Sequence, residues 1–563
     1  GIAVKSLPSA RHEYHYEPGE GLPVATINFG EQKDIPVGTD LLFKIDNLPA
    51  AHFYVSMGED FSVPAPLSSF AALAGATMLL HLSSSPAAIG EEKRRHDLAA
   101  AHSIRCCAAC LRSASGGGES STDLAWDGQA MIYEMGDCLA SAKRFAMAPR
   151  LIFADIDLDR LAQERMRNIS FARNGRQHGE YLRRFRPISF SVALPFHDEL
   201  LLQRELPRFP CVPSDADVRR QWCLEAFQIQ TQGLAKRLVS SGIQKVVLGV
   251  SGGLDSTLAL IAVVFTMDHL GYPRTNIKAY TMPAFGTTER TLNNARQLMK
   301  ELGVDAHEKN IETLCLQMLR DINHPFANGQ SIYDRTFENV QAGERTSLLF
   351  RLANQEDALV VGTGDLSELA LGWCTYGVGD HMSHYNINAS IPKTLVSHPL
   401  LWSAEDERIS AEAKRIICDI LQMDISPELI PGQDGEQSVQ KTEDVIGPYE
   451  LQDFHLFYTL RFGYLPTKIA FLAYCAWHDV HKGTWPGTPD HKKHAYSLSE
   501  IKKWLRIFLC RFFQTTQYKR TCVPNGPSID PAASLSPRGS YCVPSDSEAA
   551  IWLANLNEVP DDL

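Results

Sequence analysis

The chain lacks any apolar run long enough to cross a bilayer. A membrane-spanning helix needs about 20 consecutive apolar residues, and no stretch of this 563-residue sequence approaches that length. The chain also has fewer basic than acidic residues, with 54 Lys and Arg against 66 Asp and Glu. Nonspecific nucleic-acid binding depends on neutralising phosphates with basic residues, so a formal net charge of −12 argues against it. The composition therefore argues against a membrane protein and against a general nucleic-acid binder.

The thirteen cysteines lack the spacing of a disulfide framework, and no secretory leader is visible. The nearest pair is Cys107 and Cys110, beside Cys106. No second such pair and no cluster of histidines accompanies it, which argues against a zinc site. We expect these residues to be buried thiols in the reducing environment of the cytoplasm.

A buried strand, a glycine-rich turn and the start of a helix follow one another between residues 245 and 264. The apolar run 246–250 predicts a parallel strand covered on both faces. Gly252 and Gly253 then let the backbone turn sharply and approach a ligand. Asp255 and Ser256 open an apolar helix, whose N-terminus directs N–H groups and a positive dipole end toward the turn. Together these features predict an anion site.

The turn is not a Walker loop, because no Gly-Lys-Ser/Thr follows it. The residues Ser251-Gly252-Gly253-Leu254-Asp255-Ser256 resemble the pyrophosphate loop of AMP-forming ATP pyrophosphatases. In that superfamily the loop holds the β,γ-pyrophosphate of ATP while a nucleophile takes the α-phosphate. The alternative is a chance glycine-rich connection between a strand and a helix.

Strands and helices alternate from residue 246 to residue 361, which predicts a parallel, doubly wound sheet. Such sheets bind ligands beyond the carboxyl ends of their strands. The Ser251 loop and the Gly362 loop both follow strands, so we expect them to face one site. Thr363, Asp365 and Glu368 lie just beyond the second strand, and Mg²⁺ prefers carboxylates together with phosphate oxygens. The alternative is an ordinary helix start with acidic residues in its first turn.

The sequence predicts four parts. Residues 1–165 read as a partial, β-rich α/β domain, with strands expected at 41–45, 53–57, 77–82 and 151–156 and a helix over 91–112. A proline-punctuated linker is expected over 166–214. The domain with the parallel sheet is expected over 215–448 and a helical C-terminal extension over 449–563, with helical stretches at 454–477 and 499–513.

Several motifs resemble those of the synthetase domain of NAD synthetase in their order and spacing. The resemblance extends over essentially the whole chain. The motifs are Ser251 to Thr257, Thr336 to Gly343 with Arg345, Gly362 to Asp380, and Asn386 to Leu395. The tail segments 426–429, 451–454 and 519–527 resemble the long, glutamine-dependent, actinobacterial-type form of this family.

The resemblance implies a fold and a set of site residues. The fold is a nitrilase-like α/β/β/α domain, partial here, followed by a doubly wound parallel-sheet ATP pyrophosphatase domain related to the adenine nucleotide alpha hydrolases. The implied ATP-binding residues are Gly249, Ser251, Gly252, Gly253, Asp255, Ser256 and Thr363. Asp255 and Glu368 are the implied Mg²⁺ ligands, and both are catalytic together with Lys393. The implied substrate-binding residues are Asn339, Glu368, Trp373, Cys374, Thr375, Tyr376, Asp380 and Lys519.

The family's reaction implies ATP and Mg²⁺ as cofactors and deamido-NAD as the substrate. The nicotinate carboxylate attacks the α-phosphate of ATP, and ammonia then displaces AMP to form the amide of NAD. Mg²⁺ and Lys393 would offset charge that develops on the phosphates. The family forms homo-oligomers, and its intact members take the ammonia from glutamine.

The N-terminal part resembles the family's glutaminase domain, which uses a Glu–Lys–Cys triad. Lys5 occupies the lysine position. The cysteine is expected before Glu-Asp, but Gly58 stands before Glu59 and Asp60. Glycine cannot form a thioester, so this half is predicted to be inactive. The triad glutamate is expected upstream of Gly1, which suggests an N-terminally incomplete chain. Cys106 or Cys107 is the alternative nucleophile, although buried core thiols are favoured.

Two other functions stay open from the sequence. Another AMP-forming pyrophosphatase, such as a GMP synthetase or a tRNA-modifying enzyme, shares the Ser251 loop but is not expected to carry the segment 368–380. The acidity of the chain also argues against a tRNA substrate. A catalytically dead assembly subunit is the second alternative, and the intact synthetase motifs argue against it.

Overall fold

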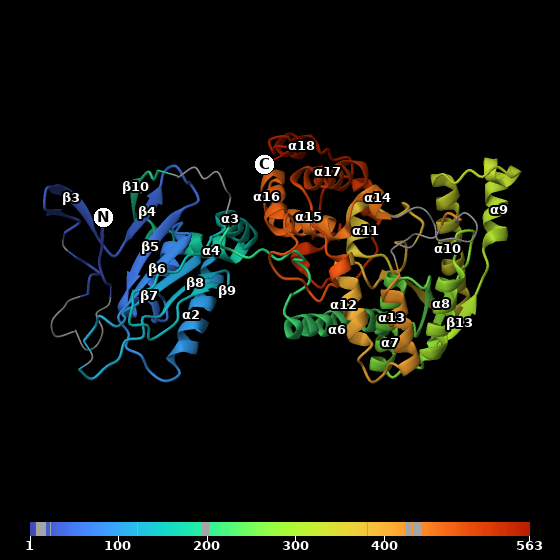
Figure 1. The fold of residues 1–563 in the computed structure, drawn as a ribbon, viewed down its shortest axis with the longest axis horizontal. Helices are drawn as coiled ribbons and strands as arrows, with labels where there is room; N and C mark the ends of the chain where they lie inside the picture. The colour runs from blue at the N-terminus through green and yellow to red at the C-terminus, as the bar shows by residue number, and fades with distance from the viewer. Residues whose placement is uncertain are drawn as a thin grey trace. The chain divides into compact units, whose positions relative to one another are not determined.

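The structure of the chain is a computed structural model (Figure 1). It describes residues 1–6, 18–22, 24–120, 122–193, 202–379, 381–423, 429–431 and 442–562. The chain divides into two compact units, Gly1–Glu205 (unit 1) and Leu206–Leu563 (unit 2). Within the described residues, no helix combines the length and the apolar character required to cross a membrane.

Unit 1 is built on a mixed sheet. Its described residues form a seven-stranded sheet in the order β10-β4-β5-β6-β7-β8-β9, in which β5, β6 and β7 are parallel. The strands are β4 (Leu41–Ile45), β5 (His52–Met57), β6 (Met78–Ser83), β7 (Ala109–Ala114), β8 (Ala130–Glu134), β9 (Asp137–Ser141) and β10 (Arg186–Phe190). A smaller sheet joins β1 (Ile2–Ala3), β3 (Gln32–Gly38) and β2 (Thr26–Phe29).

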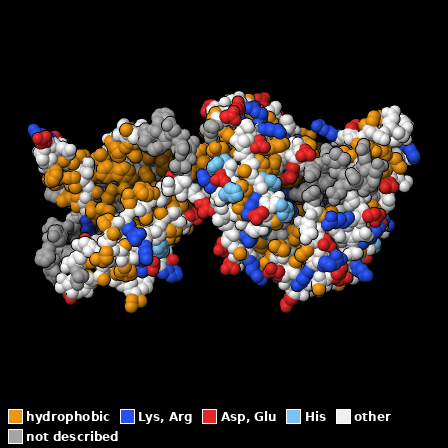
Figure 2. Space-filling view, in the orientation of Figure 1, with side chains coloured by type: hydrophobic (Ala, Val, Ile, Leu, Met, Phe, Trp, Pro, Cys, Tyr) orange, Lys and Arg blue, Asp and Glu red, His pale blue; other side chains and the backbone are white. Residues whose placement is uncertain are grey.

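Helices α1 (Leu67–Leu73) and α2 (Glu91–Cys106) contact the larger sheet of unit 1. Their core includes Tyr54 and Leu79, whose side chains leave the central strands on one face. The side chains on the opposite face of these strands are also apolar. There the rings of Phe43 and Phe53 stack with their centroids 5.0 Å apart. Figure 2 shows hydrophobic side chains gathered over β4 and β5.

Unit 1 differs from its expected outline in three places. The expected strand at 151–156 is irregular, and the helix expected over 91–112 ends at Cys106, because Cys107 takes a left-handed conformation (φ 44°) before β7 begins. Part of the expected linker, 166–214, contains α4 (Ile169–Gln177) and β10. β10 pairs in parallel with β4, and Arg186 binds Asp40 at 2.7 Å, so residues up to Glu205 fold with unit 1.

The sheet of unit 2 is parallel, as predicted. Its described strands follow the order β13-β12-β11-β14-β15, and each neighbouring pair is parallel. The strands are β11 (Lys245–Gly249), β12 (Ile277–Thr281), β13 (Asp305–Glu308), β14 (Ala358–Gly362) and β15 (Tyr385–Asn386). Val246 and Leu248 enter one core while Val247 enters another, which explains why β11 is apolar throughout.

Helices cover both faces of this sheet, so the doubly wound arrangement is confirmed. One core includes α6 (Ala216–Ser241), α7 (Leu254–Leu270), α8 (Glu289–Glu301), α12 (Lys393–Ser403) and α13 (Ala411–Leu421). The opposite core includes α9 (Glu312–Asp321) and α10 (Arg335–Glu356).

The C-terminal helices enclose a further core that includes the short helix α11. These elements are α11 (Leu366–Leu371), α14 (Thr442–Ile446), α15 (Tyr449–Phe462), α16 (Pro466–Trp477), α17 (Leu498–Leu509) and α18 (Ala550–Leu556). Gly463, with φ 63°, ends α15, and Pro466 begins α16. These two residues divide the single helical stretch expected over 454–477. Because α11 follows β14, this core lies beside the carboxyl edge of the sheet.

The turn after β11 supplies a stability prediction. Gly252 has φ 86°, and a Cβ built on it would lie 2.3 Å from the carbonyl oxygen of Thr291. Gly252→Ala should therefore lower the free energy of unfolding of unit 2 by about 2 kcal/mol or more. Gly253→Ala is the matched control, because its φ is −92° and its nearest new contact is Ser251 Oγ at 3.4 Å. Equal unfolding temperatures of the two variants would contradict the interpretation that position 252 requires glycine while position 253 does not.

Candidate active site

The loops that follow β11 and β14 meet at one edge of the sheet. The two strands are parallel neighbours, so their carboxyl ends lie together. Asn388 joins the loops directly, because its Nδ2 donates to the carbonyl oxygens of Asp255 (2.9 Å) and Thr363 (3.0 Å). Gln230 in turn donates to Asn388 Oδ1 at 3.0 Å. The predicted convergence of the two loops is confirmed.

Hydroxyl groups hold the Ser251 loop in shape. Ser251 Oγ accepts from the N–H of Gly253 at 3.2 Å and lies 3.0 Å from Ser256 Oγ. Ser256 Oγ also accepts from the N–H of Ser251 at 3.2 Å. Gly253 is the N-cap of α7 and has no side chain to cap the helix, so the positive helix end faces the loop. This arrangement suits an anion such as a phosphate group.

Three carboxylates surround one buried ammonium group beside this loop. Lys393 Nζ lies 2.6 Å from Asp365, 2.7 Å from Asp255 and 3.0 Å from Glu368. Asp255 opens α7, Asp365 is the N-cap of α11, Glu368 lies in the first turn of α11, and Lys393 begins α12. One oxygen from each carboxylate lies within 4.8 Å of the others. We call these four residues the carboxylate cage.

The carboxylate cage has an unbalanced charge, because one ammonium faces three carboxylates. Burial alone would lower the pKa of Lys393, but Asp255, Asp365 and Glu368 raise it well above its ordinary value. Burial, followed by the charge of Glu368, raises the pKa of Asp365 well above its ordinary value, while Lys393 opposes this rise. The donor set is hard and anionic, so the residues fit a divalent cation such as Mg²⁺.

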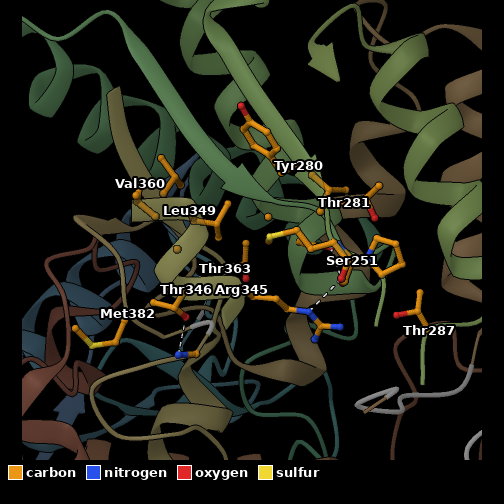
Figure 3. Close-up of a pocket in the computed structure, with 18 residues that line it drawn as sticks. Ser251, Tyr280, Thr281, Thr287, Arg345, Thr346, Leu349, Val360, Thr363 and Met382 are labelled. Atoms are coloured by element: carbon orange, nitrogen blue, oxygen red, sulfur yellow. Dashed lines mark hydrogen bonds between the residues drawn. The ribbon is translucent and has the colours of Figure 1, made fainter. Parts of the chain in front are cut away.

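A cavity opens between the Ser251 loop and β12. Its lining combines apolar side chains with hydroxyl groups: Val250, Ser251, Tyr280, Thr281, Met282, Thr287, Arg345, Thr346, Leu349, Val360, Thr363 and Met382. Figure 3 shows the Arg345 side chain extending toward the Ser251 end of this cavity. Arg345 Nε donates to the carbonyl oxygen of Met282 at 3.3 Å, which places a permanent cation near the loop.

A second cavity, of about 260 Å³, shares Ser251, Arg345 and Gly379 with the first. The carboxylate cage contributes Asp255, Glu368 and Lys393 to its wall. Predicted substrate residues also line it, namely Trp373, Cys374 and Thr375. The two cavities are therefore two lobes of one site, with the Ser251 loop and Arg345 where they meet.

The remaining predicted substrate residues differ in position. Lys519 Nζ donates to the carbonyl oxygens of Gly372 (2.9 Å) and Cys374 (2.5 Å), and burial lowers its pKa. Asn339 Oδ1 accepts from Thr375 Oγ1 at 2.7 Å. Tyr376 is half exposed against Tyr518 and is not among the residues that line either cavity. Asp380 lies outside the described residues.

Some residues of the site were not predicted. Tyr449 lines the second cavity, and its ring lies 5.3 Å from Lys393 Nζ. Asn388 joins the two loops. No sequence signal marked Tyr449, and Asn388 lies within the motif 386–395 without being singled out there, because the roles of both residues arise from tertiary packing. Asp365 was expected only as one of the carboxylates after β14, although Asp365 and Glu368 form a capping box, which is a recognisable pattern.

In unit 1 the structure brings Lys5 and Gly58 together. Gly58 follows β5, begins the 3-10 helix η1 (Gly58–Phe61) and has φ 63°. A Cβ built on Gly58 would lie 2.5 Å from Lys5 Nζ. A sharp turn between a strand and a helix is the geometry that exposes the nucleophile in α/β-hydrolases. At this position the side chain is a hydrogen atom.

The nearby cysteines do not resemble reactive thiols. Cys106, Cys107 and Cys110 are buried, as predicted, whereas the prediction of buried thiols is wrong for Cys138, Cys418 and Cys542, which are exposed. Burial raises the pKa of Cys106 to about 11 and raises the pKa of Cys107 and Cys110. Cys106 Sγ lies 3.7 Å from His102 Nε2, but burial lowers the pKa of His102 to about 4. A buried thiol beside a neutral imidazole is a weak nucleophile.

The anion loop, the carboxylate cage and the two-lobed cavity together define a nucleotide-binding α/β enzyme. The family model described as NAD synthase matches residues 226–449. The chain is 48% identical over 566 residues to the glutamine-dependent NAD(+) synthetase of Mycobacterium tuberculosis (strain ATCC 25618 / H37Rv), covering 100% of this chain and 83% of that relative. The enzyme of the same description from Mycobacterium leprae (strain TN) is 48% identical over 568 residues with the same coverage. The chain belongs to the family of glutamine-dependent NAD(+) synthetases.

Among solved structures, the glutamine-dependent NAD(+) synthetase from Cytophaga hutchinsonii is 17% identical. It covers 99% of this chain and 80% of its own chain, with a TM-score of 0.46. The predicted family is confirmed by the relatives in sequence, and the predicted α/β fold class is confirmed by the topology of both units. Family membership does not favour the other AMP-forming pyrophosphatases.

The carboxylate cage predicts a pH-dependent stability effect. Lys393→Met leaves buried carboxylates without their ammonium, so the pKa of Asp365 should rise further. The folded variant then binds more protons than its unfolded chain, and its stability falls as pH rises. We expect a loss of about 3–5 kcal/mol at pH 8 and a smaller loss at pH 5.5.

Thermal unfolding of wild type and variant at both pH values measures this difference. Lys245→Met is the control, because Lys245 is 41% exposed in its ion pair with Glu356 and its loss should cost no more than about 1 kcal/mol. A Lys393→Met loss that is the same at both pH values would contradict the interpretation.

Proposed function

We propose that this NAD synthetase is a ligase that forms the amide C–N bond of NAD from deamido-NAD and ammonia, with conversion of ATP to AMP and pyrophosphate. The observation that supports this proposal is the carboxylate cage, which lies beside the anion loop where the two cavities meet. Breaking the bond between the α- and β-phosphates needs charge stabilisation at both groups, and this site supplies it from fixed residues. The homo-oligomeric state and the cytoplasmic location stay predictions.

ATP would occupy the first cavity, with its pyrophosphate on the Ser251 loop. Val250, Leu349 and Val360 offer apolar contacts suited to an adenine ring. The N-terminus of α7 and the hydroxyl groups of the loop favour the phosphates. Gly249, Ser256 and Thr363 line this cavity, and Gly253 lines the second cavity. Gly252 lines neither cavity and stays a predicted ATP-binding residue.

Asp255 and Glu368 would hold Mg²⁺, with Asp365 beside them. When bound, the cation supplies charge compensation to the phosphate oxygens. Lys393 shares these carboxylates, so its ammonium lies where it can bind the α-phosphate as negative charge develops there. The side chains of the cage thus position and stabilise the reacting groups, and no protein nucleophile is required.

Deamido-NAD would occupy the second cavity, with its nicotinate carboxylate directed at the α-phosphate. Trp373, Cys374 and Thr375 line this cavity, and Asn339 supports Thr375. Lys519 fixes the segment through two carbonyl oxygens. Direct contacts from Tyr376 and Asp380 stay predictions from the resemblance.

The metal assignment is tested by removing one carboxylate charge at a time. Asp255→Asn and Glu368→Gln should each lower turnover of deamido-NAD by about 100-fold or more, because each removes electrostatic stabilisation at the phosphates. Rates should be measured over a range of Mg²⁺ concentrations, with thermal unfolding as a check of folding. Asp268→Asn, on the same helix as Asp255 but paired with Arg274, should retain turnover within about twofold. Near-normal turnover of both cage variants at limiting Mg²⁺ would refute the assignment.

We propose free ammonia as the nitrogen donor. Amide hydrolysis through a thioester requires a sulfur at the position where Lys5 Nζ approaches β5, and Gly58 provides none. The relatives from Mycobacterium are described as glutamine-dependent, and we propose that this chain, with glycine at position 58, lacks that activity. The raised pKa values of Cys106, Cys107 and Cys110 make them poor substitutes.

The purified chain should form NAD, AMP and pyrophosphate with ammonium chloride, and should form none with glutamine alone. Cys106→Ser and Cys107→Ser should leave the ammonium-dependent rate unchanged, because neither thiol belongs to unit 2. Release of glutamate from glutamine at a rate matching NAD formation would overturn the proposal, and loss of that release in either serine variant would identify the thiol. Nucleotide binding without turnover would instead support an assembly subunit.

A further inference from the structure

Helix α12 carries Lys393 at its first position but has no cap of its own. Its N-cap is Pro392, whose side chain cannot accept a hydrogen bond. The first N–H groups of a helix have no partner within the helix. In α12 these groups bind side chains from two other helices: the N–H of Lys393 donates to Ser367 Oγ at 2.8 Å, and the N–H of Thr394 donates to Asp453 Oδ2 at 2.9 Å.

Asp453 comes from α15, in the C-terminal part of unit 2, and is 2% exposed. Its carboxylate accepts three hydrogen bonds, from the N–H of Thr394, from Thr394 Oγ1 at 2.7 Å and from Ser367 Oγ. An ionised carboxylate is an acceptor only, so three donors satisfy it well. It also faces the positive end of the α12 dipole.

Ser367 connects this carboxylate to the cage. It lies on α11 between Asp365 and Glu368, donates to Asp453 Oδ1 and accepts from the N–H of Lys393. One carboxylate therefore fixes the helix that carries two acids of the cage and the helix that carries its ammonium. Asp453 itself is not among the residues that line the cavities, so any effect on the reaction must pass through its neighbours.

We propose that Asp453 is a positioning residue for NAD formation: it caps α12 from the C-terminal part of the chain and holds Lys393 in register with Asp365 and Glu368. This role rests on the proposed function of Lys393. A displacement of about 1 Å in a reacting site can lower turnover about 100-fold. The C-terminal helices are thus a structural component of the synthetase site.

Gln452 offers a matched control for Asp453. It is the preceding residue of α15 and is equally buried, at 1% exposed. Its Nε2 donates to the carbonyl oxygens of Ile446 and Trp504, which lie away from α11 and α12. Gln452→Ala therefore damages the packing of the same helix and leaves the cap of α12 intact.

Three variants test the role by turnover. Asp453→Ala should lower kcat about 10- to 100-fold with ammonium as the donor, and Gln452→Ala should leave kcat within about threefold even if its Tm falls. Asp453→Asn should lie between wild type and Asp453→Ala. Its amide oxygen can keep the bonds to Thr394, but its NH₂ group cannot accept from Ser367.

A double-mutant cycle with Lys393→Ala distinguishes positioning from general destabilisation. If Asp453 acts through Lys393, adding Asp453→Asn to Lys393→Ala should lower kcat no further. Equal losses in the Asp453 and Gln452 variants, or multiplication of the two single losses in the double variant, would overturn the proposal.

Amide hydrogen exchange keeps the test independent of activity. Asp453→Ala removes the acceptor of the Thr394 N–H and the partner that orients Ser367, so it should speed exchange of the amides of Lys393 and Thr394 at least tenfold, and Gln452→Ala should leave them protected. Unchanged protection in Asp453→Ala would refute the capping role. If the wild type forms no NAD, the proposed function fails, and the exchange result alone then decides whether Asp453 caps α12.

Discussion

The ion pairing of the buried Lys393 with Asp255, Asp365 and Glu368 is the interaction on which the synthetase site depends. An isolated buried ammonium would shed its proton, and isolated buried carboxylates would take one up. Together, their mutual attraction offsets part of the cost of burying them and holds three helix starts against one another. The charge left over after this pairing explains how the same residues can attract a divalent cation and position the phosphates of a nucleotide.

The fold assembles these charges from distant parts of the sequence. Parallel pairing of β11 with β14 brings Asp255 next to the start of α11, and Asn388 fastens the two loops. Helix α12 then returns to the same edge with Lys393 at its first position. The C-terminal helices enclose α11 in their own core and supply Tyr449 and Asp453, so the site is completed by residues that follow the sheet domain.

The sequence was sufficient to predict the parts of the site that local patterns encode. The apolar run of β11, the paired glycines and the acids after β14 predicted a parallel sheet with one shared edge, and the resemblance added Lys393. Tertiary partners were not predictable in this way. Asn388 and Asp453 act through hydrogen bonds across 133 and 59 residues of sequence, and no local pattern encodes such contacts. The strand expected at 151–156 failed for a related reason, because an apolar run forms a strand only where a neighbouring strand is available to pair with it.

The proposed function requires that the substrate carboxylate is activated by adenylation at this site. Deamido-NAD labelled with ¹⁸O in its nicotinate carboxylate tests this claim directly when it is converted by the purified chain with ATP and ammonium. Attack of the carboxylate on the α-phosphate, followed by displacement by ammonia, leaves one labelled oxygen on the phosphate of AMP. Mass spectrometry should therefore find one ¹⁸O in each AMP formed. Unlabelled AMP, or label in inorganic phosphate together with ADP, would contradict the account.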